Sequence, residues 1–316
     1  MKDHYDKIVA AAAQISPVLP FHKSATIEKA SVHVEEASRQ GAHIVVFPEC
    51  FVPMYPNWSI DFAEPGVWED HLTEFMLHSV DLDSGDLDPL KQVARSYKTI
   101  VVIGINERVK RYDGMLYNSL VFIGQDGEIL GVHRKVFPSN REKLFHTRGN
   151  GSTLQVFDTP IGRLGGLICY EHLQPLLKYA CIAQGEQIHC ASWPGWPNFK
   201  TGRSNKHVID IASRAYALEG QCFVIASSLY VPPSEAEKAN LGHADWSFFG
   251  GSAIIGPSGE YIAGPVYDQE TVIYGELDFR LIPKRKASID VTGRDSAPEV
   301  IQLKLNTKNP GFISEE

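Results

Sequence analysis

The chain has 316 residues, of which 43% are hydrophobic and 22% charged, and this composition excludes a fibrous or a wholly disordered protein. Its 38 acidic and 30 basic residues give a formal net charge of −8, which argues against a protein that mainly binds nucleic acid or an anionic membrane surface. No stretch approaches the ~20 apolar residues of a membrane span, and the N-terminus shows no apolar segment of signal-peptide length. The five cysteines have no CxxC spacing, so we expect neither a disulfide framework nor a zinc cage, but a reduced, cytoplasmic protein.

Apolar runs rich in β-branched residues recur along the chain, and each ends at glycine, proline or polar residues. These runs predict short strands, in chain order Lys7–Ile15, Ala42–Phe47, Thr99–Ile105, Ser119–Ile123, Ile129–His133, Leu154–Phe157, Arg163–Cys169, Ile188–Ala191, Cys222–Ser227, Ser252–Ile255 and Thr271–Leu277. Helical periodicity predicts helices at Ser24–Gln40, Asp88–Tyr97, Leu173–Gln184 and Ser204–Glu219. So many strands with so few helices predict two sheets packed face to face, with helices covering the outside.

The chain contains no internal repeat, no low-complexity tract and no segment that reads as a linker between domains. We therefore expect one domain over residues 1–280. From about Arg280 the alternation of apolar and polar residues is lost, and the sequence becomes basic and then polar. Residues 281–316 are accordingly predicted to form a C-terminal tail that lies at the periphery or contacts a partner subunit.

Three of the predicted strands end at residues that can carry out covalent chemistry. Glu49 follows HIVVFP, Lys135 follows ILGVHR, and Cys169 ends GRLGGLIC. Together they suffice for acyl or imidoyl transfer, because a carboxylate can take the thiol proton while an ammonium stabilises the anion that develops when sulfur attacks carbon. A nearby cation and the start of the helix predicted at Leu173–Gln184 would both favour the thiolate form of Cys169.

Each of these residues also fits a purely structural role. Cys169 at the end of an apolar strand could be an inert buried thiol, and Glu49 after a proline could cap a turn. Lys135 beside Arg134 could be part of a solvated basic pair. Strand ends can bring side chains from different parts of the chain into one cleft, so the three residues together favour a catalytic role. By themselves they do not decide between a catalytic and a structural role.

The sequences around these residues resemble the three catalytic motifs of the nitrilase superfamily of carbon–nitrogen hydrolases. The matching motifs are PEC at Pro48–Cys50, HRKVFP at His133–Pro138 and CYEH at Cys169–His172. Further segments resemble the family in its order: FPECFVPMYPNW at Phe47–Trp58, LYNS at Leu116–Ser119, a second glutamate at Glu142, and DVTGRDSAPEVIQL at Asp290–Leu303. The resemblance extends from about Ile8 to Leu303, nearly the whole chain.

The resemblance implies a four-layer αββα sandwich, an α/β fold that works with neither a metal nor an organic cofactor. It also implies the catalytic roles: Cys169 as the nucleophile, Glu49 as the general base, and Lys135 as the group that stabilises the tetrahedral species. Glu142 would orient the base or the substrate. The scattered histidines show no pair with metal-ligand spacing, so no metal site is expected from the residues either.

Three aromatic side chains are predicted to bind substrate. Tyr55 lies close to Glu49 in sequence, and Trp193 belongs to IHCASWPGWP, which resembles the nitrilase segment that lines the pocket. His172 belongs to CYEH, which resembles nitrilases and cyanide-degrading relatives more than amidases, where an aspartate is more usual two places after the cysteine. Tyr170 departs from the tryptophan usual in nitrilases, so the preferred nitrile stays open.

The resemblance implies a nitrilase that converts a small-molecule nitrile to the carboxylic acid and ammonia through a thioimidate and a thioester. An amidase or a cyanide-converting relative is the alternative, and a catalytically silent binding module is a third. No nucleic-acid or membrane partner is expected. The segment Leu173–Gln184 is apolar on more than one face, which predicts at least a homodimer across this helix, unless the chain's own tail covers the second face.

Overall fold

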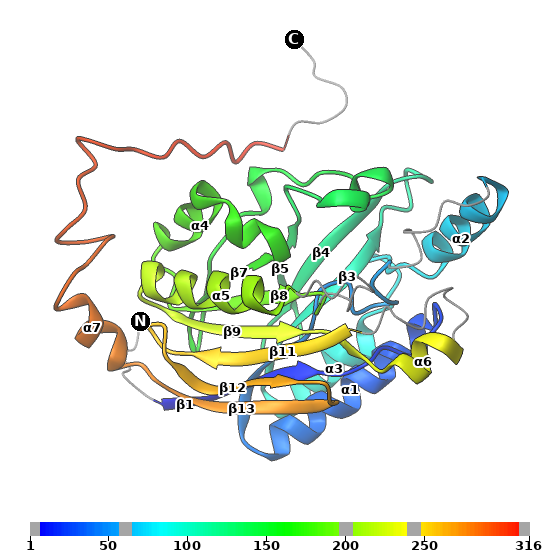
Figure 1. Cartoon of the computed structure of the whole chain (residues 1–316), viewed down its shortest axis with the longest axis horizontal. Coiled ribbons are helices and arrows are strands. Elements are labelled where there is room, and N and C mark those ends of the chain that lie inside the picture. Colours follow the sequence, from blue (N-terminus) through cyan, green and yellow to red (C-terminus); the bar gives the residue numbers. More distant parts are fainter. Residues whose placement is uncertain (1–6, 57–64, 196–204, 239–247, 310–316) are drawn as a thin grey trace, which may run out of the picture.

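The computed structural model describes residues 7–56, 65–195, 205–238 and 248–309. Two β-sheets pack face to face, and helices cover both outer faces (Figure 1). The predicted four-layer αββα sandwich is therefore confirmed, and the helices α1 and α3 lie on the opposite side of the sheets from α4 and α5 (Figure 1).

The first sheet combines five strands of the N-terminal half with one strand from near the C-terminus. Its order is β13 (Thr271–Asp278), β1 (Lys7–Gln14), β2 (Ala42–Val46), β3 (Ile100–Arg108), β4 (Leu116–Ile123) and β5 (Ile129–Arg134). The strands β1, β2 and β3 are parallel, whereas β13, β4 and β5 pair antiparallel with their neighbours. Because β5 reverses β4 and β4 reverses β3, β2 and β5 end at the same edge of the sheet.

The second sheet repeats this plan with a parallel centre. Its order is β10 (Tyr230–Val231), β11 (Phe248–Ile255), β9 (Phe223–Ser228), β8 (Ile188–Trp193), β7 (Gly162–Ile168) and β6 (Phe157–Thr159), and β12 (Tyr261–Tyr267) pairs with β11. The strands β7, β8 and β9 are parallel. Their buried, nearly continuous apolar sequences are typical of parallel strands that are covered on both faces.

Helices occupy the outer layers. They are α1 (Lys23–Arg39), α2 (Pro65–Leu77), α3 (Asp88–Tyr97), α4 (Pro175–Ile182), α5 (Lys206–Gly220), α6 (Pro233–Lys238) and α7 (Leu281–Lys286), and there are 3-10 turns η2 (Asn140–Leu144), η3 (Gly151–Thr153) and η4 (Cys169–Leu173). No helix within the described residues is long and apolar enough to cross a membrane.

Alternate side chains of β1 pack into two different hydrophobic cores, one on each face of the first sheet. Ala10 and Ala12 face the second sheet, in the cluster that fills the space between the sheets. Ala11 and Ala13 face outward, against the buried face of α1 and α3. Small side chains at all these positions allow the layers on both sides to approach closely, because each alanine occupies little of the space between neighbouring elements.

Several predicted boundaries differ from the structure. The strand predicted at Leu154–Phe157 begins only at Phe157. The 3-10 turn η3 lies directly before Leu154, and Asn150 caps this turn by accepting a hydrogen bond from Ser152 N at 2.9 Å. The helix predicted at Leu173–Gln184 begins at Pro175, since the residue before a proline favours an extended backbone. The strand β12 and the helix α2 were not predicted, and Ser204 lies outside the described residues.

Hydrogen bonds across the sandwich fix the two sheets against each other near the strand ends. The Ser192 hydroxyl donates to the Phe47 carbonyl at 3.0 Å, and Glu49 N donates to the Trp193 carbonyl at 3.3 Å. Farther along, the Ser227 hydroxyl donates to the Ala13 carbonyl at 2.6 Å. The backbone that follows β2 is thus held by the second sheet as well as by its own.

Gly104 on β3 lets that backbone approach its neighbour strand. A Cβ at this position would lie 2.2 Å from the Pro48 carbonyl oxygen and 2.8 Å from Cys50 N. Any larger residue would therefore push away the segment that carries Glu49, so Gly104 is needed for the position of that carboxylate.

Replacing Gly104 with alanine should destabilise the protein, because the added methyl group has no room. Overpacking of a core costs about 1–3 kcal/mol, and we expect urea unfolding of G104A to show a loss of about 2 kcal/mol. Gly114→Ala is the control, since its added Cβ would meet no heavy atom within 4 Å. Equal stability of the two variants would contradict the close approach at Gly104.

Candidate active site

The predicted catalytic residues lie where β2, β5 and β7 end. Lys135 directly follows β5 and Cys169 directly follows β7, while Glu49 comes three residues after the end of β2. All three are buried, with exposed fractions of 1% or less. The fold therefore brings the carboxylate, the ammonium and the thiol to one edge of the sandwich, although more than 80 residues of sequence separate Glu49 from Lys135.

The Lys135 ammonium lies between two carboxylates. Its Nζ donates to Glu49 Oε1 at 2.7 Å and to Glu142 Oε2 and Oε1 at 2.9 and 3.1 Å. Burial alone would lower the pKa of Lys135, but the negative charges of Glu142 and Glu49 outweigh burial and raise it well above its usual range. Lys135 is therefore a fixed positive charge in a site that excludes water.

Glu49 has one oxygen held and one oxygen free. Its Oε1 accepts hydrogen bonds from Lys135 Nζ and from Asn118 Nδ2, each at 2.7 Å. Its Oε2 is buried and has no hydrogen-bond partner among the described residues. Burial raises the pKa of Glu49 to about 7 even though Lys135 opposes the shift, so this carboxyl can accept and return a proton near neutral pH.

Glu142 is held on every side by the protein. Its Oε2 accepts from Ser139 N at 2.8 Å, and its Oε1 accepts from the Tyr55 hydroxyl at 3.2 Å. Burial would raise the pKa of Glu142, but the charge of Lys135, the contribution of His146 and the hydrogen bonds from Ser139 N and Lys135 together lower it. Glu142 thus stays ionised while Glu49, beside it, titrates near neutrality. The different surroundings of the two carboxyl groups therefore give them different pKa values.

Cys169 occupies a backbone conformation that few residues adopt. Its φ is +52°, and it forms the first residue of the turn η4 directly after an extended strand. Such a conformation costs about 1–3 kcal/mol in a residue other than glycine, and it turns the chain sharply where the thiol is presented.

The expectation that the surroundings favour the thiolate of Cys169 is wrong. Burial and the negative charge of Glu49 raise the pKa of the Cys169 thiol well above its usual range, and Lys135 offsets them only in part. The helix α4 also begins six residues after Cys169, so its N-terminus does not start at the sulfur. The resting nucleophile is therefore a thiol, and its proton must be removed during the attack.

Glu171 ties the nucleophile turn to the lysine segment. Its Oε2 accepts from Ile168 N at 3.0 Å and from His133 Nε2 at 2.8 Å, and its Oε1 accepts from Val136 N at 2.7 Å. One buried carboxylate thus bridges the backbone just before Cys169 and the backbone just after Lys135. Glutamate reaches both strand ends from within the turn, so this position fixes the spacing of the two catalytic segments.

His172 does not have a ring nitrogen available for a substrate, which corrects the prediction made for it. Its Nδ1 donates to the Cys169 carbonyl at 2.7 Å, and its Nε2 lies 2.9 Å from Nε2 of His189. The His189 Nδ1 lies 2.8 Å from Glu186 Oε1, and the Tyr216 hydroxyl donates to Glu186 Oε2 at 2.5 Å. His172 is the first member of a buried chain of hydrogen bonds behind the nucleophile.

The protons of this chain can be assigned from its ends. A carbonyl only accepts, so His172 Nδ1 carries a hydrogen and its neutral ring accepts at Nε2 from His189. His189 then accepts at Nδ1, which requires a protonated Glu186. Burial raises the pKa of Glu186 to about 8, and burial together with His189 lowers the pKa of His172 to about 3. The cluster is therefore neutral at pH 7.

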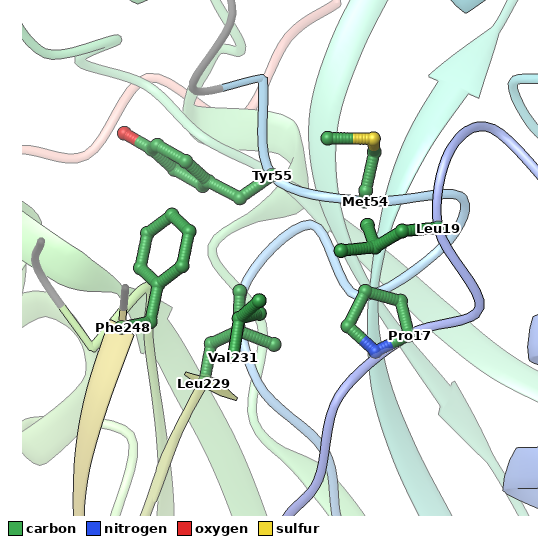
Figure 2. Close-up of a pocket in the computed structure, with 7 residues that line it drawn as sticks. All are labelled: Pro17, Leu19, Met54, Tyr55, Leu229, Val231 and Phe248. Atoms are coloured by element: carbon green, nitrogen blue, oxygen red, sulfur yellow. The ribbon is translucent and has the colours of Figure 1, made fainter. Parts of the chain in front are cut away.

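Tyr55 and Trp193 keep places beside the catalytic residues. Tyr55 and six apolar residues, Pro17, Leu19, Met54, Leu229, Val231 and Phe248, line a small pocket, and Figure 2 shows the Tyr55 hydroxyl pointing away from Pro17 and Leu19. The hydroxyl instead reaches Glu142, so the ring separates the apolar pocket from the carboxylate. Trp193 stacks on His172 with ring centroids 4.8 Å apart, and its buried Nε1 has no hydrogen-bond partner in the described part of the chain.

Sequence reasoning assigned no role to Asn118, Glu186 or His189. Asn118 lies inside LYNS, a segment that resembled the family, but only its position opposite Glu49 reveals its function. Glu186 lies between Gly185 and Gln187 just before β8, and His189 lies within β8, and an isolated acid or histidine at such a place gives no signal. Residues 57–58 and 196–197, at the ends of two segments used in the resemblance, lie outside the described residues.

No cluster of three or more histidine, cysteine, aspartate or glutamate residues within the described ranges could hold a metal ion. All five cysteines belong to described segments and are buried free thiols.

Comparison with known proteins places the chain in a family. A family model described as carbon-nitrogen hydrolase matches residues 9–286. A nitrilase of Penicillium rubens is 34% identical over 98% of this chain and 97% of its own length, and an aliphatic nitrilase of Rhodococcus rhodochrous is 35% identical over 96% of this chain and 80% of its own. The crystal structure of a carbon–nitrogen hydrolase from Helicobacter pylori G27 superposes with a TM-score of 0.73 at 21% identity, covering 93% of this chain and 97% of that one. The chain belongs to the carbon–nitrogen hydrolase family of enzymes.

Proposed function

We propose that this enzyme is a nitrilase that hydrolyses a nitrile to the carboxylic acid and ammonia. The observation that carries the proposal is that the two carboxylate oxygens of Glu49 differ in their surroundings. Lys135 and Asn118 donate hydrogen bonds to Oε1, while Oε2 is buried and has no partner among the described residues. The charges of Glu49 and Lys135 both act on the Cys169 thiol. A base with a free oxygen, a neutral thiol and a fixed cation are the groups that thiol addition to a nitrile needs.

In the first half of the reaction, Glu49 Oε2 takes the proton of Cys169 as sulfur bonds to the nitrile carbon. The electron pair released from the carbon–nitrogen triple bond moves to nitrogen, which takes the proton back from Glu49 and gives a thioimidate. Lys135 stabilises the negative charge that develops in this step. Because the resting group is a thiol, the proton transfer and the attack are coupled.

In the second half, water adds to the thioimidate as Glu49 takes its proton and passes it to nitrogen. The resulting tetrahedral carbon bears sulfur, hydroxyl and amine, and its collapse with loss of ammonia leaves a thioester. A second water hydrolyses the thioester to the acid and restores the Cys169 thiol. If the tetrahedral species instead expels sulfur, it releases an amide, so one site allows both exits.

Glu171 supports the nitrilase assignment over an amidase. Its three hydrogen bonds span the Cys169 and Lys135 segments, and an aspartate here would be one methylene shorter. The names of the two relatives quoted above, nitrilase and aliphatic nitrilase, support the same substrate class. Cyanide conversion and amide hydrolysis are the alternative functions.

We also propose a homodimer that forms across α4 and α5. Leu177 and Cys181 of α4 face the core, whereas Leu176 on its other side is 69% exposed. Ile211 of α5 is also largely exposed, and Lys178 of α4 forms an ion pair with Glu219 of α5. Since Leu176 is this exposed, the described part of the tail does not cover it, and a second copy of the same face supplies an apolar partner.

The C-terminal tail is proposed to contact the partner subunit. After α7 the described chain passes through turns at 291–295 and 298–300 and then runs on to residue 309 (Figure 1). Val300 and Ile301 lie at a turn, where their backbone N–H groups donate to the Ala297 carbonyl, and they are 74% and 75% exposed, so two β-branched apolar side chains face water. We place the enzyme in the cytoplasm, because five buried free thiols suit a reducing compartment.

Ammonia release from a panel of nitriles, with the matching amides alongside, tests the function. Wild type should release ammonia and acid from nitriles, and Cys169→Ala should abolish turnover while the protein stays folded by circular dichroism. Mass spectrometry during turnover should show an adduct on Cys169. Cys222→Ala, which removes a thiol distant from the site, is the control and should stay active. Turnover of amides without nitriles would contradict the proposal, as would activity in Cys169→Ala.

Glu142→Gln tests the three-charge arrangement through the pH profile. In wild type kcat/KM should rise through pH 7, because Glu49 with a pKa of about 7 must be ionised to act. Removing the negative charge of Glu142, which raises the pKa of Glu49, should move this rise to lower pH. The turnover rate should also fall roughly a hundredfold, since Lys135 loses one of its two carboxylate partners. Glu128→Gln at the surface is the control, and a near-normal rate in Glu142→Gln would contradict the assignment.

Variants of Glu186 test the neutral chain behind the nucleophile. Glu186→Gln should keep kcat within about threefold, because an amide donates to His189 and accepts from Tyr216 as a protonated carboxyl does. Glu186→Leu should lower kcat about tenfold or more with little change in KM, and should slow alkylation of Cys169 by iodoacetamide. His172→Asn keeps a donor for the Cys169 carbonyl, so its kcat should exceed the kcat of His172→Phe. A severe loss in Glu186→Gln would instead indicate an ionised Glu186.

Leu176→Lys tests the dimer. A lysine at the centre of an apolar self-complementary face places two like charges opposite each other, so sedimentation velocity at micromolar concentration should show dissociation to monomers. Val32→Lys, on the opposite outer layer of the sandwich, is the matched control and should sediment as wild type does. A wild-type protein that is monomeric and fully active would exclude the dimer.

A further inference from the structure

The side chain of Asn106 on β3 is buried, and its amide bonds to two separate segments of the chain. Its Nδ2 donates to the Val52 carbonyl at 3.1 Å and to the Met54 carbonyl at 3.0 Å, and its Oδ1 lies 3.0 Å from Nε2 of His146. The backbone N of Asn106 also donates to the Val52 carbonyl, at 2.8 Å. Both carbonyls belong to the segment that follows Glu49, so this one residue fixes that segment against β3.

His146 joins the same amide to the turn that carries Glu142. Because Nδ2 of Asn106 faces two carbonyls, its Oδ1 faces the imidazole, and Nε2 of His146 carries the hydrogen that it donates. The backbone N of His146 donates to the Glu142 carbonyl at 2.7 Å. Burial lowers the pKa of His146 to about 4, so the ring is neutral at pH 7 and this link does not change near neutral pH.

Tyr55 closes these contacts into a ring. It directly follows Met54, and its hydroxyl donates to Oε1 of Glu142 at 3.2 Å. From Asn106, one path runs through Met54 and Tyr55 to the carboxylate of Glu142. The other path runs through His146 to the main chain of Glu142. The carboxylate and the main chain of Glu142 are therefore both tied to a single side chain on β3.

This ring bears on the catalytic groups through Lys135. The ammonium contacts Glu49 at 2.7 Å and Glu142 at 2.9 and 3.1 Å, and the two carboxylates come from segments far apart in the sequence. Asn106 is bonded to the first segment directly and to the second through His146, so a shift of one segment against the other would lengthen a contact of Lys135. Catalytic groups must be held within about 0.5 Å of their productive positions, and the ring suits this task.

We propose that Asn106 and His146 are positioning residues for hydrolysis, and that they act through the hydrogen bond between Tyr55 and Glu142. The inference rests on the proposed nitrilase function for its substrate and adds two residues to the machinery of that site. In this role neither residue contacts the substrate, and together they set the separation of the segments that carry Glu49 and Glu142. A purely structural role would lower the stability of the protein and leave the turnover of the folded fraction unchanged.

Variants that open the ring at different points test this role. Tyr55→Phe removes one hydroxyl, and His146→Phe keeps an aromatic ring but has no donor for Asn106. Each should lower kcat about tenfold, the size expected for one hydrogen bond, with less than about threefold change in KM. His146→Gln places an amide nitrogen where Nε2 was, so its kcat should stay within about threefold of wild type. Asn106→Leu opens both paths and should lower kcat at least as far as His146→Phe.

The double variant Tyr55→Phe/His146→Phe distinguishes coupled from independent effects. If both residues act through one hydrogen bond, its kcat should fall only about tenfold, whereas independent losses would multiply to about a hundredfold. Thr99→Val is the control, since Thr99 is buried beside the opposite end of β3 and its hydroxyl donates to the Ala42 carbonyl at 3.2 Å. It should lower the stability of the protein to urea and leave kcat as in wild type.

Rates are measured with whichever nitrile or amide the wild-type protein hydrolyses. Alkylation of Cys169 by iodoacetamide should slow in parallel with kcat, and it needs no substrate. A normal kcat in His146→Phe, equal losses in His146→Gln and His146→Phe, or about a hundredfold loss in the double variant would overturn the proposal. If His146→Phe does not fold, Asn106→Leu completes the same cycle with Tyr55→Phe. Hydrolysis of amides without nitriles would contradict the proposed function alone, because the ring is then tested on amides.

Discussion

The site depends on one buried ammonium shared by two buried carboxylates. Taking these charges out of water costs several kcal/mol for each ion, and only the short contacts of Lys135 with Glu49 and Glu142 offset that cost. One positive and two negative charges leave the group one unit negative when all three are ionised. Water is excluded, so this excess falls on Glu49, the carboxyl with a free oxygen, and its affinity for a proton rises into the range that general-base catalysis needs.

The sandwich makes this arrangement possible by fixing backbone rather than side chains. Glu49 is held by hydrogen bonds of the segment after β2 to the second sheet and by the close approach at Gly104. Glu171 bridges the segments that carry Cys169 and Lys135. Each catalytic side chain therefore projects from a backbone that at least two elements hold, which suits a reaction whose groups must keep sub-ångström positions without the help of a metal.

The two sides of the nucleophile differ in electrostatics. In front of Cys169 lie the fixed charges of Glu49, Lys135 and Glu142, which act on the proton that moves. Behind it lies the chain from His172 through His189 to Glu186 and Tyr216, in which burial favours the neutral form of every group. A neutral chain can hold the Cys169 carbonyl in its uncommon backbone conformation without adding another charge that would disturb the pKa of Glu49.

The sequence alone predicted most of the strands, the two-sheet sandwich, and the positions of Glu49, Lys135 and Cys169 at strand ends. This was possible because apolar alternation and turn residues act over a few neighbouring positions. Which oxygen of Glu49 is free, the neutral thiol of Cys169, and the engagement of both His172 nitrogens could not be derived in this way. Each depends on partners that lie far apart in the chain, such as Asn118 for Glu49 and His189 for His172, and on a loss of solvent that no local pattern encodes. The sequence determined which chemical groups reach the edge of the sandwich. Only the packing of two sheets decided their protonation, because a pKa depends on burial and on charges a few ångströms away.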